Sequence, residues 1–315
     1  MEITDGRTRI VITGRVAARP RTVFQQHVKG QALDSPLVAE GFGRRYRRTR
    51  PWAVRDVSLA VPAGSITALV GANGAGKSTM IRACLGFERP DKGRLLVFGI
   101  DPRRDRTRAV NSAAYVPQGA SLYRSLTIRD HFDLARGARP SFDSAYALGR
   151  VRAAGLSPER RISELSGGEG AQVALALALG TRAELLLLDE PLASLDPLAR
   201  RDFLNALVDD VRGRGATALL SSHIVTDVEQ ACDRLVVLAD GRLVLDAAVV
   251  MARAELRTVL ASELGGRVAI GTFAGQAGEP LALVRDASVG RAASLEEIVL
   301  GHLAAARSQT REEAA

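Results

Sequence analysis

The sequence is poor in aromatic residues and in cysteine, and it has no long hydrophobic run. Only 4% of the 315 residues are aromatic, and the two cysteines, Cys84 and Cys232, cannot form a disulfide framework, which favours a reducing cytosol. The richest apolar run, Val173–Leu179, is far shorter than the roughly 18 to 20 residues of a membrane-spanning helix. The N-terminus lacks a basic start followed by an apolar core, so no secretory signal is expected. We therefore expect a chain that does not itself cross a bilayer.

Positive charge is unevenly distributed. The net charge is +8, and the first 50 residues hold eleven Arg and Lys against four acidic residues, while the rest of the chain is nearly balanced. A basic arm can bind nucleic acid or an anionic membrane surface, although a solvated and poorly ordered tail is the commoner case. We expect residues 1–35 to form such a tail, and we expect no nucleic-acid partner.

From residue 36 onward the hydrophobic pattern predicts an α/β fold. Ile66–Val70 is an apolar run that ends directly in Gly71, which indicates a buried strand that leads into a loop. Lys77–Leu85 follows with good helix formers and no proline. Residues 101–161 are rich in Arg, Ala and Leu, so we predict a mostly helical insert there.

The later part of the chain predicts further core strands and then an appendage. Leu185–Leu188 and Ala218–Ser221 read as parallel core strands with polar ends, and Asp240-Gly241 favours a tight hairpin turn. Residues 247–315 form the expected appendage, in which Ser294–Glu297 is a capping box that begins a last docked helix.

Gly71–Thr79 reads GANGAGKST, which meets the G-x-x-x-x-G-K-S spacing of a phosphate-binding loop. Glycines allow backbone amides to turn toward phosphate oxygens, and the N-terminus of the following helix adds its dipole. The lysine would neutralise the β- and γ-phosphates of ATP, and the serine hydroxyl would complete the coordination of Mg²⁺. The candidate nucleotide-binding residues of the loop are Gly71, Asn73, Gly74, Gly76, Lys77, Ser78 and Thr79.

An acid pair follows the strand predicted at Leu185–Leu188. Asp189 and Glu190 would lie at the carboxyl end of a buried strand, where α/β proteins bind ligands. Asp189 is a candidate Mg²⁺ ligand, directly or through water, and Glu190 is a candidate base that orients or deprotonates the attacking water. The pattern thus indicates ATP hydrolysis as well as ATP binding.

With these motifs placed, residues 36–246 resemble the ATPase of an ATP-binding-cassette (ABC) transporter. The discriminating motif is Leu165–Glu169, LSGGE, which is similar to the family's LSGGQ signature. The resemblance implies a phosphate-loop core with an antiparallel β subdomain and a helical signature subdomain. It also implies that Ser166, Gly167 and Gly168 face the γ-phosphate held by a second ATPase subunit, so that each site is shared in a dimer, with a homodimer expected.

The resemblance implies roles for four more residues. Gln118 resembles the glutamine that reaches magnesium and water, and Asp196 resembles the residue of a loop that carries contacts across the dimer, although it also suits an ordinary helix cap. His223 resembles the histidine that senses the γ-phosphate. Tyr46 is at the place of the aromatic residue that stacks on adenine, with Trp52 as its competitor. The other histidines, His27, His131 and His302, are expected to be structural.

This sequence departs from the family pattern at two points. Glu169 stands where the signature usually has glutamine, and Ala171-Gln172 stands where many members have a basic residue. Neither change removes the serine or the glycines of the signature, so we expect activity to be retained.

The resemblance implies an ATPase that powers transport through a separate membrane permease, at the cytoplasmic face of the membrane. The order of the motifs, the single cassette and the ending Ser294–Leu303 resemble bacterial exporters of drugs, antibiotics or lipids. The alternative is a soluble ABC ATPase that acts on the ribosome or DNA. The short spacing between Lys77 and Ser166, without heptads or CxxC pairs, and the presence of one cassette only disfavour it.

Overall fold

A computed structural model describes residues 35–47, 49–119, 121–193 and 195–314 of the chain. Of the sequence-based predictions, His27 and all but the last residue of the basic tail predicted over residues 1–35 lie outside the described residues. No helix in the described part of the chain is long and apolar enough to span a membrane.

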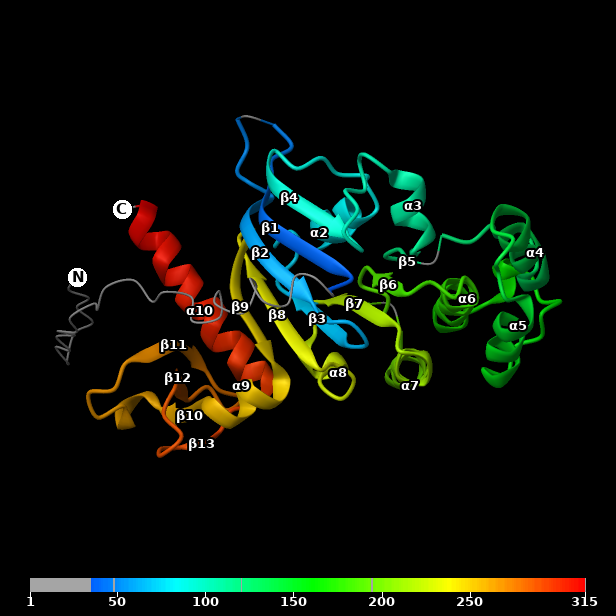
Figure 1. The fold of residues 1–315 in the computed structure, drawn as a ribbon. Helices are drawn as coiled ribbons and strands as arrows, with labels where there is room; N and C mark the ends of the chain where they lie inside the picture. Colours follow the sequence, from blue (N-terminus) through cyan, green and yellow to red (C-terminus); the bar gives the residue numbers. More distant parts are fainter. Residues whose placement is uncertain (1–34, 48, 120, 194, 315) are drawn as a thin grey trace.

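The centre of the molecule is a six-stranded sheet in the order β5-β6-β7-β3-β8-β9 (Figure 1). The first five strands are parallel, and β9 pairs with β8 in the antiparallel sense. The strands predicted at 66–70, 185–188 and 218–221 all lie in this sheet, which confirms them. The six strands are β3 (Ile66–Val70), β5 (Ala113–Val116), β6 (Leu185–Leu188), β7 (Thr217–Ser222), β8 (Arg234–Ala239) and β9 (Arg242–Ala248).

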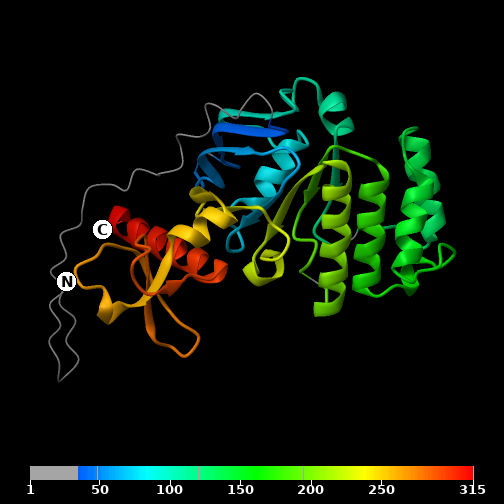
Figure 2. The same cartoon turned by 60° about the horizontal axis from the view of Figure 1, so that its bottom comes forward.

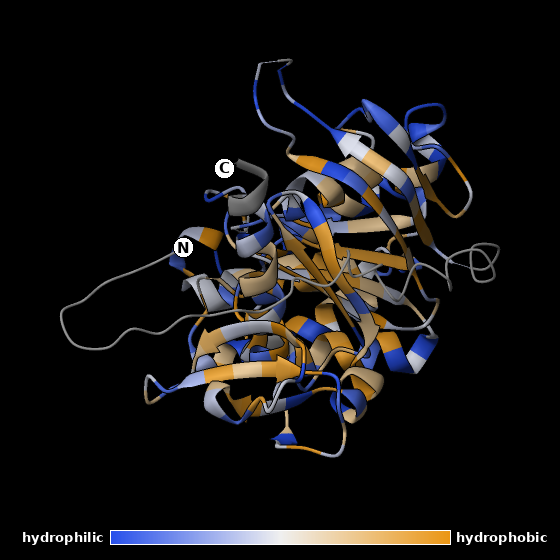
Figure 3. Ribbon diagram, turned by 90° about the vertical axis from the view of Figure 1, so that its left-hand side faces the viewer, coloured by the Kyte–Doolittle hydropathy of each residue, from blue (hydrophilic) through white to orange (hydrophobic). Residues whose placement is uncertain are grey.

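Both faces of this sheet are buried, which explains why its strands are continuous hydrophobic runs. Successive leucines of β6 belong to different cores: Leu186 and Leu188 pack with helices α6 (Gly167–Gly180) and α7 (Pro197–Arg214), whereas Leu185 and Leu187 pack with α2 (Lys77–Cys84) on the other face. Figure 3 shows the same arrangement, with hydrophobic strands in the middle and hydrophilic loops around them.

A second, antiparallel sheet covers the α2 face in the order β2-β1-β4. It consists of β1 (Leu37–Arg44), β2 (Val54–Val61) and β4 (Lys92–Val97). Its apolar side chains, such as Phe42 and Val57, are fully buried in one core with the residues of α2. This sheet is the antiparallel subdomain that the resemblance implied.

The Asp240-Gly241 hairpin is confirmed: these two residues connect β8 to β9. Both have a left-handed backbone, with φ of 47° at Asp240 and 75° at Gly241, as a two-residue turn of the favoured type requires.

The prediction of a mostly helical insert over residues 101–161 was wrong in one respect. The segment contains helices α3 (Arg106–Asn111), α4 (Ile128–Ala138) and α5 (Ser144–Ala153), but β5 lies between the first two and forms the edge of the central sheet. The sequence of β5, Ala-Ala-Tyr-Val, is short and begins with two alanines, which carry little strand preference. Figure 2 shows α7, α6, α5 and α4 side by side at one end of the molecule.

The residues after β9 form a third sheet, ordered β11-β12-β10-β13, and a long final helix. The capping box predicted at 294–297 is confirmed, because the Glu297 amide donates to Ser294 Oγ (3.2 Å) and the Ser294 amide donates to Glu297 Oε2 (2.9 Å). Helix α10 then buries Leu295, Ile298 and Val299. The elements are α8 (Val225–Val228), α9 (Val249–Glu255), β10 (Arg257–Leu260), β11 (Ala269–Ala274), β12 (Pro280–Val284), β13 (Arg291–Ala292) and α10 (Leu295–Ala314), with 3₁₀ turns at Ile162–Glu164 and Ala261–Glu263.

Candidate functional site

The loop between β3 and α2 has a backbone conformation that requires glycine at its end. Gly76 precedes the first residue of α2 and has φ of +104°, a conformation that side chains rarely adopt. A Cβ on Gly76 would lie 2.5 Å from the carbonyl oxygen of Ala53. Because α2 begins directly at Lys77, the free amides of its first turn point toward the loop. The loop therefore has the form of an anion cradle.

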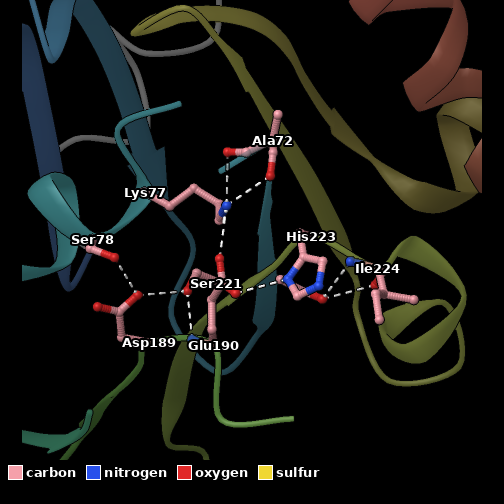
Figure 4. A network of polar contacts seen from close by, with 10 residues as sticks. Ala72, Lys77, Ser78, Asp189, Glu190, Ser221, His223 and Ile224 are labelled. Carbon is pink, nitrogen blue, oxygen red and sulfur yellow. Dashed lines mark hydrogen bonds and ion pairs between the residues drawn. The ribbon is translucent and has the colours of Figure 1, made fainter. Parts of the chain in front are cut away.

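Lys77 lies at the centre of a buried polar network (Figure 4). Its Nζ donates to the carbonyl oxygens of Gly71 (2.7 Å) and Ala72 (3.1 Å) and lies 2.9 Å from Glu190 Oε1. The loop carbonyls and the acid after β6 therefore share one ammonium group. Phosphate oxygens bound in the loop would compete with them for this cation.

Glu190 links this lysine to His223. Its second carboxylate oxygen, Oε2, lies 2.8 Å from His223 Nδ1, and its backbone is in the left-handed region with φ of 48°. Burial raises the pKa of Glu190, but the hydrogen bonds and charges of Lys77 and then His223 outweigh burial and bring the pKa below its usual value of 4.5. Glu190 is thus a carboxylate at neutral pH, as a base that orients or deprotonates water must be.

Asp189 faces the other side of the loop. Its Oδ1 accepts hydrogen bonds from Ser78 Oγ (2.9 Å) and Ser221 Oγ (3.0 Å). The hydroxyl and the carboxylate offer the hard oxygen ligands that Mg²⁺ prefers, together with waters and substrate phosphates. Among the described residues no cluster of three or more His, Cys, Asp or Glu could hold a metal by itself. The Ser78 hydroxyl and the Asp189 carboxylate have the oxygen chemistry that suits Mg²⁺.

The signature lies at the start of α6, a different element from the loop. Ser166 caps α6, and both Ser166 and Gly167 are exposed, so the start of this helix lies at the surface. A Cβ on Gly168 would come 3.1 Å from Ala199 Cβ, so a side chain there would press against α7. One chain thus carries two separate helix N-termini, one after the glycine loop and one at the signature.

The phosphate loop and the signature both lie in the part of the chain that matches a known protein family. The family described as ABC transporter matches residues 54–193. The chain is 33% identical to the ABC transporter ATP-binding protein YtrB of Bacillus subtilis, covering 60% of this chain and 65% of YtrB. It is 33% identical to the lipopolysaccharide export system ATP-binding protein LptB of Haemophilus influenzae, covering 67% of this chain and 89% of LptB.

A third relative, the phosphonates import ATP-binding protein PhnC 1 of Natronomonas pharaonis, is 36% identical over 67% of this chain and 92% of its own length. A solved structure of the ATP-binding subunit of an ABC transporter has a TM-score of 0.62 and 29% identity, covering 70% of this chain and 92% of that chain. The chain belongs to the ABC transporter ATP-binding family. The ABC ATPase fold implied by the sequence is therefore confirmed, and the family is one of ATPases.

In this ABC ATPase, Tyr46 lies against the phosphate-loop helix. The Tyr46 hydroxyl is 3.1 Å from Thr79 Oγ1 and donates to Glu88 Oε1 (3.0 Å), and the ring is half exposed. Trp52 lies elsewhere and is contacted by two cations, since Arg45 and Lys92 lie 4.8 and 5.6 Å from its ring centroid. Of the two aromatic candidates for stacking on adenine, only Tyr46 hydrogen-bonds to a residue of the loop in the described part of the chain.

The structure brings Gln118 to the same sheet edge as the acid pair. β5 and β6 are parallel, and Val116 pairs with Leu188, so Gln118 and Glu190 each lie two residues beyond this pair. The Gln118 side chain is exposed. Asp196 caps α7 and accepts hydrogen bonds from the amides of Leu198 and Ala199, both at 3.0 Å, so the helix-cap alternative describes its contacts within this chain.

Two histidines, His131 of the ATPase unit and His302 of the appendage, have the structural surroundings expected of them. His131 is buried, and its Nε2 accepts a hydrogen bond from the Tyr123 amide at 2.9 Å. His302 Nδ1 lies 2.7 Å from the carbonyl oxygen of Ile298 on its own helix. Burial lowers the pKa of His302, so it is neutral in the fold.

Sequence reasoning missed the part played by Ser221. The Ser221 hydroxyl donates to Asp189 Oδ1 and accepts a hydrogen bond from the Glu190 amide (2.8 Å), so it fixes both acids at once. The sequence feature that could have indicated Ser221 is its position near the carboxyl end of β7, the strand that pairs with β6. Glu88, the partner of Tyr46, gave no signal, because it reaches the site from a turn after α2.

Proposed function

We propose that the chain is the ATP-hydrolysing subunit of a membrane transporter. The observation that carries this proposal is the buried network Lys77–Glu190–His223 beside a glycine loop at a helix N-terminus. In one place it combines a cation for phosphates, a carboxylate base and a histidine that contacts the base. A module that only binds ATP has no use for a deprotonated, positioned carboxylate.

Each residue of the site has a proposed role. Lys77 and the amides of the loop bind the β- and γ-phosphates, and Tyr46 stacks on adenine. Glu190 orients the attacking water and accepts its proton, and His223 senses the γ-phosphate. Ser78 and Asp189, with Gln118 nearby, would hold Mg²⁺, which would supply positive charge to the phosphates. The loop residues proposed to contact the nucleotide are Gly71, Asn73, Gly74, Gly76, Lys77, Ser78 and Thr79.

The active site is proposed to be shared between two copies. Ser166 and Gly167 are exposed at the start of α6 and are followed by Gly168, and this helix N-terminus is the second position on the chain that suits a phosphate. In a head-to-tail pair this helix end of one copy would face the γ-phosphate held by the other, with Asp196 close to the contact. The isolated monomer is then expected to hydrolyse ATP poorly.

The transporter is proposed to contain a separate membrane permease, which places this chain at the cytoplasmic face of the membrane. The proposed direction is export, in keeping with LptB, whose name assigns it to an export system. In this scheme residues 36–246 are the ATPase unit, residues 1–35 are a tail, and residues 247–315 are an appendage.

The test is to purify the full chain with the membrane protein that accompanies it in its host. Inside-out vesicles are then given ATP together with fluorescent phospholipid and a fluorescent cationic drug as probes. Magnesium-dependent ATP turnover is expected, together with accumulation of a probe in the lumen. A complex without ATP turnover would overturn the catalytic proposal, and recovery of ribosomes or DNA instead of a membrane protein would overturn the transporter. Efflux of a preloaded probe would reverse the direction.

A further inference from the structure

The acidic residue of the signature lies at an anion-binding helix end. The Ser166 amide donates to Glu169 Oε2 (2.7 Å), and the Glu169 amide donates to Ser166 Oγ (3.2 Å), so the carboxylate is fixed beside the N-terminus of α6. The same helix end is proposed to face a phosphate of the partner copy. A negative charge there repels the ligand, and the repulsion acts over several ångströms in a partly buried site.

Protonation does not remove this charge at neutral pH. The hydrogen bonds from Arg160 and then from the Ser166 amide outweigh burial and lower the pKa of Glu169 below its usual value of 4.5. The side chain is therefore a carboxylate under physiological conditions. Compatibility with a phosphate must come from a cation.

Arg160 supplies that cation. Its Nη1 lies 2.7 Å from Glu169 Oε1 and its Nη2 lies 3.3 Å from Oε2, so the guanidinium binds both oxygens of the carboxylate. The same Nη2 donates to the carbonyl oxygen of Glu164 (2.8 Å). An arginine with two such acceptors is held in one orientation, and the two-pronged geometry is one that lysine cannot reproduce.

The backbone of Arg160 is also fixed. Its amide donates to the carbonyl oxygen of Ser157 (3.1 Å), and its own carbonyl oxygen accepts from the amide of Ile128, the first residue of α4 (3.0 Å). The guanidinium is thus attached to the helical region rather than to a free loop. The guanidinium is therefore already fixed beside the signature before a nucleotide binds, so no side-chain ordering is needed at that step.

We propose that Arg160 is a positioning residue of the composite ATP site, which neutralises Glu169 so that an acidic signature can accept the γ-phosphate from the partner copy. This inference rests on the proposed shared site. Arg160 acts through Glu169 and touches no nucleotide itself. Glutamine at position 169 would carry no charge and would make Arg160 dispensable.

The experiment uses the full chain carrying E190Q, in which ATP is expected to bind without being hydrolysed and to hold the dimer closed. ATP is titrated, and dimer formation is followed by light scattering for E190Q alone and with R160A, E169Q or both. R160A is expected to raise the ATP concentration for half-maximal dimerisation about tenfold. In the E169Q background, R160A is expected to raise this concentration less than about twofold.

The control is R129A, which removes an arginine that pairs with Glu159 in the same region but does not contact the signature. ATP binding to monomers, through the Lys77 half of the site, checks that each variant is folded. Equal effects of R160A in both backgrounds would mean that Arg160 merely supports its loop, and no effect in either would mean that Glu169 needs no neutralisation. Both outcomes overturn the inference. Failure of the E190Q chain to dimerise with ATP would instead overturn the shared site.

Discussion

The ammonium group of Lys77 lies 2.9 Å from the carboxylate of Glu190, and both side chains are at least nine-tenths buried. The residue proposed to bind phosphate and the residue proposed to activate water are therefore ion-paired to each other. Phosphate oxygens that bind Lys77 would weaken its ion pair with Glu190, while Glu190 Oε2 keeps its contact with His223 Nδ1. This pairing makes nucleotide binding and the state of the base interdependent.

Replacing Glu190 by glutamine removes the base and keeps the shape. E190Q is expected to lower ATP turnover at least about 100-fold while ATP still binds, because the amide cannot accept the proton of water. Phosphate release and equilibrium ATP binding measure the two effects. D209N, at an exposed acid on α7, is the matched control. Undiminished hydrolysis in E190Q would remove Glu190 from the role of base.

Replacing Lys77 by methionine leaves Glu190 with a buried charge that has lost its principal partner. We expect K77M to abolish ATP binding and to lower the free energy of unfolding by about 3 kcal/mol. The double variant K77M/E190Q removes the stranded charge and should recover most of this loss. Urea denaturation of both variants is the measurement. Equal destabilisation in the two would show that the ion pair contributes little.

Stability should depend on pH through Glu190. Its pKa is lowered in the folded chain from a usual value of 4.5, so its contribution is fully present above about pH 4.5 and is lost as the pH falls through the folded pKa. The difference in unfolding free energy between wild type and E190Q should therefore shrink below about pH 4.5. A difference that stayed constant from pH 7 to pH 3 would contradict the lowered pKa.

Two glycines of the loop should respond differently to alanine. Both have positive φ, but a Cβ at Gly76 would meet the carbonyl oxygen of Ala53 at 2.5 Å, whereas a Cβ at Gly74 meets no atom within 4 Å. We expect G74A to cost about 1 kcal/mol of stability and G76A at least about 2 kcal/mol more. Thermal unfolding compares them. Similar losses would mean that strain at φ, and not the contact with Ala53, requires glycine at 76.

The parts of the fold that could be predicted from sequence are those in which local signals agree. Ile66–Val70 and Leu185–Leu188 are buried on both faces, so their apolar runs end where the strands end. β5 escaped prediction because a four-residue strand with two alanines depends on its neighbour β6 for its conformation. The short strands of the third sheet, such as β13, likewise exist only through pairing.

The candidate site divides in the same way. The residues of the phosphate loop are contiguous in sequence, and so are the two acids after β6. Each group was therefore indicated by its own local pattern. The Ser221 hydroxyl between the two acids, and Arg160 on Glu169, join segments whose approach is set by the tertiary fold. No pattern in one segment carries that information.

The order of the central sheet has a consequence for the synthesis of the chain. β3, which carries the phosphate loop, has β7 and β8 as its neighbours, and β8 ends only at Ala239. On the ribosome, the loop thus emerges long before the strands that flank it, and both edges of β3 stay unpaired until the chain has been made as far as β7. A nascent chain stopped before β7 should not bind ATP and should be prone to aggregate through those edges.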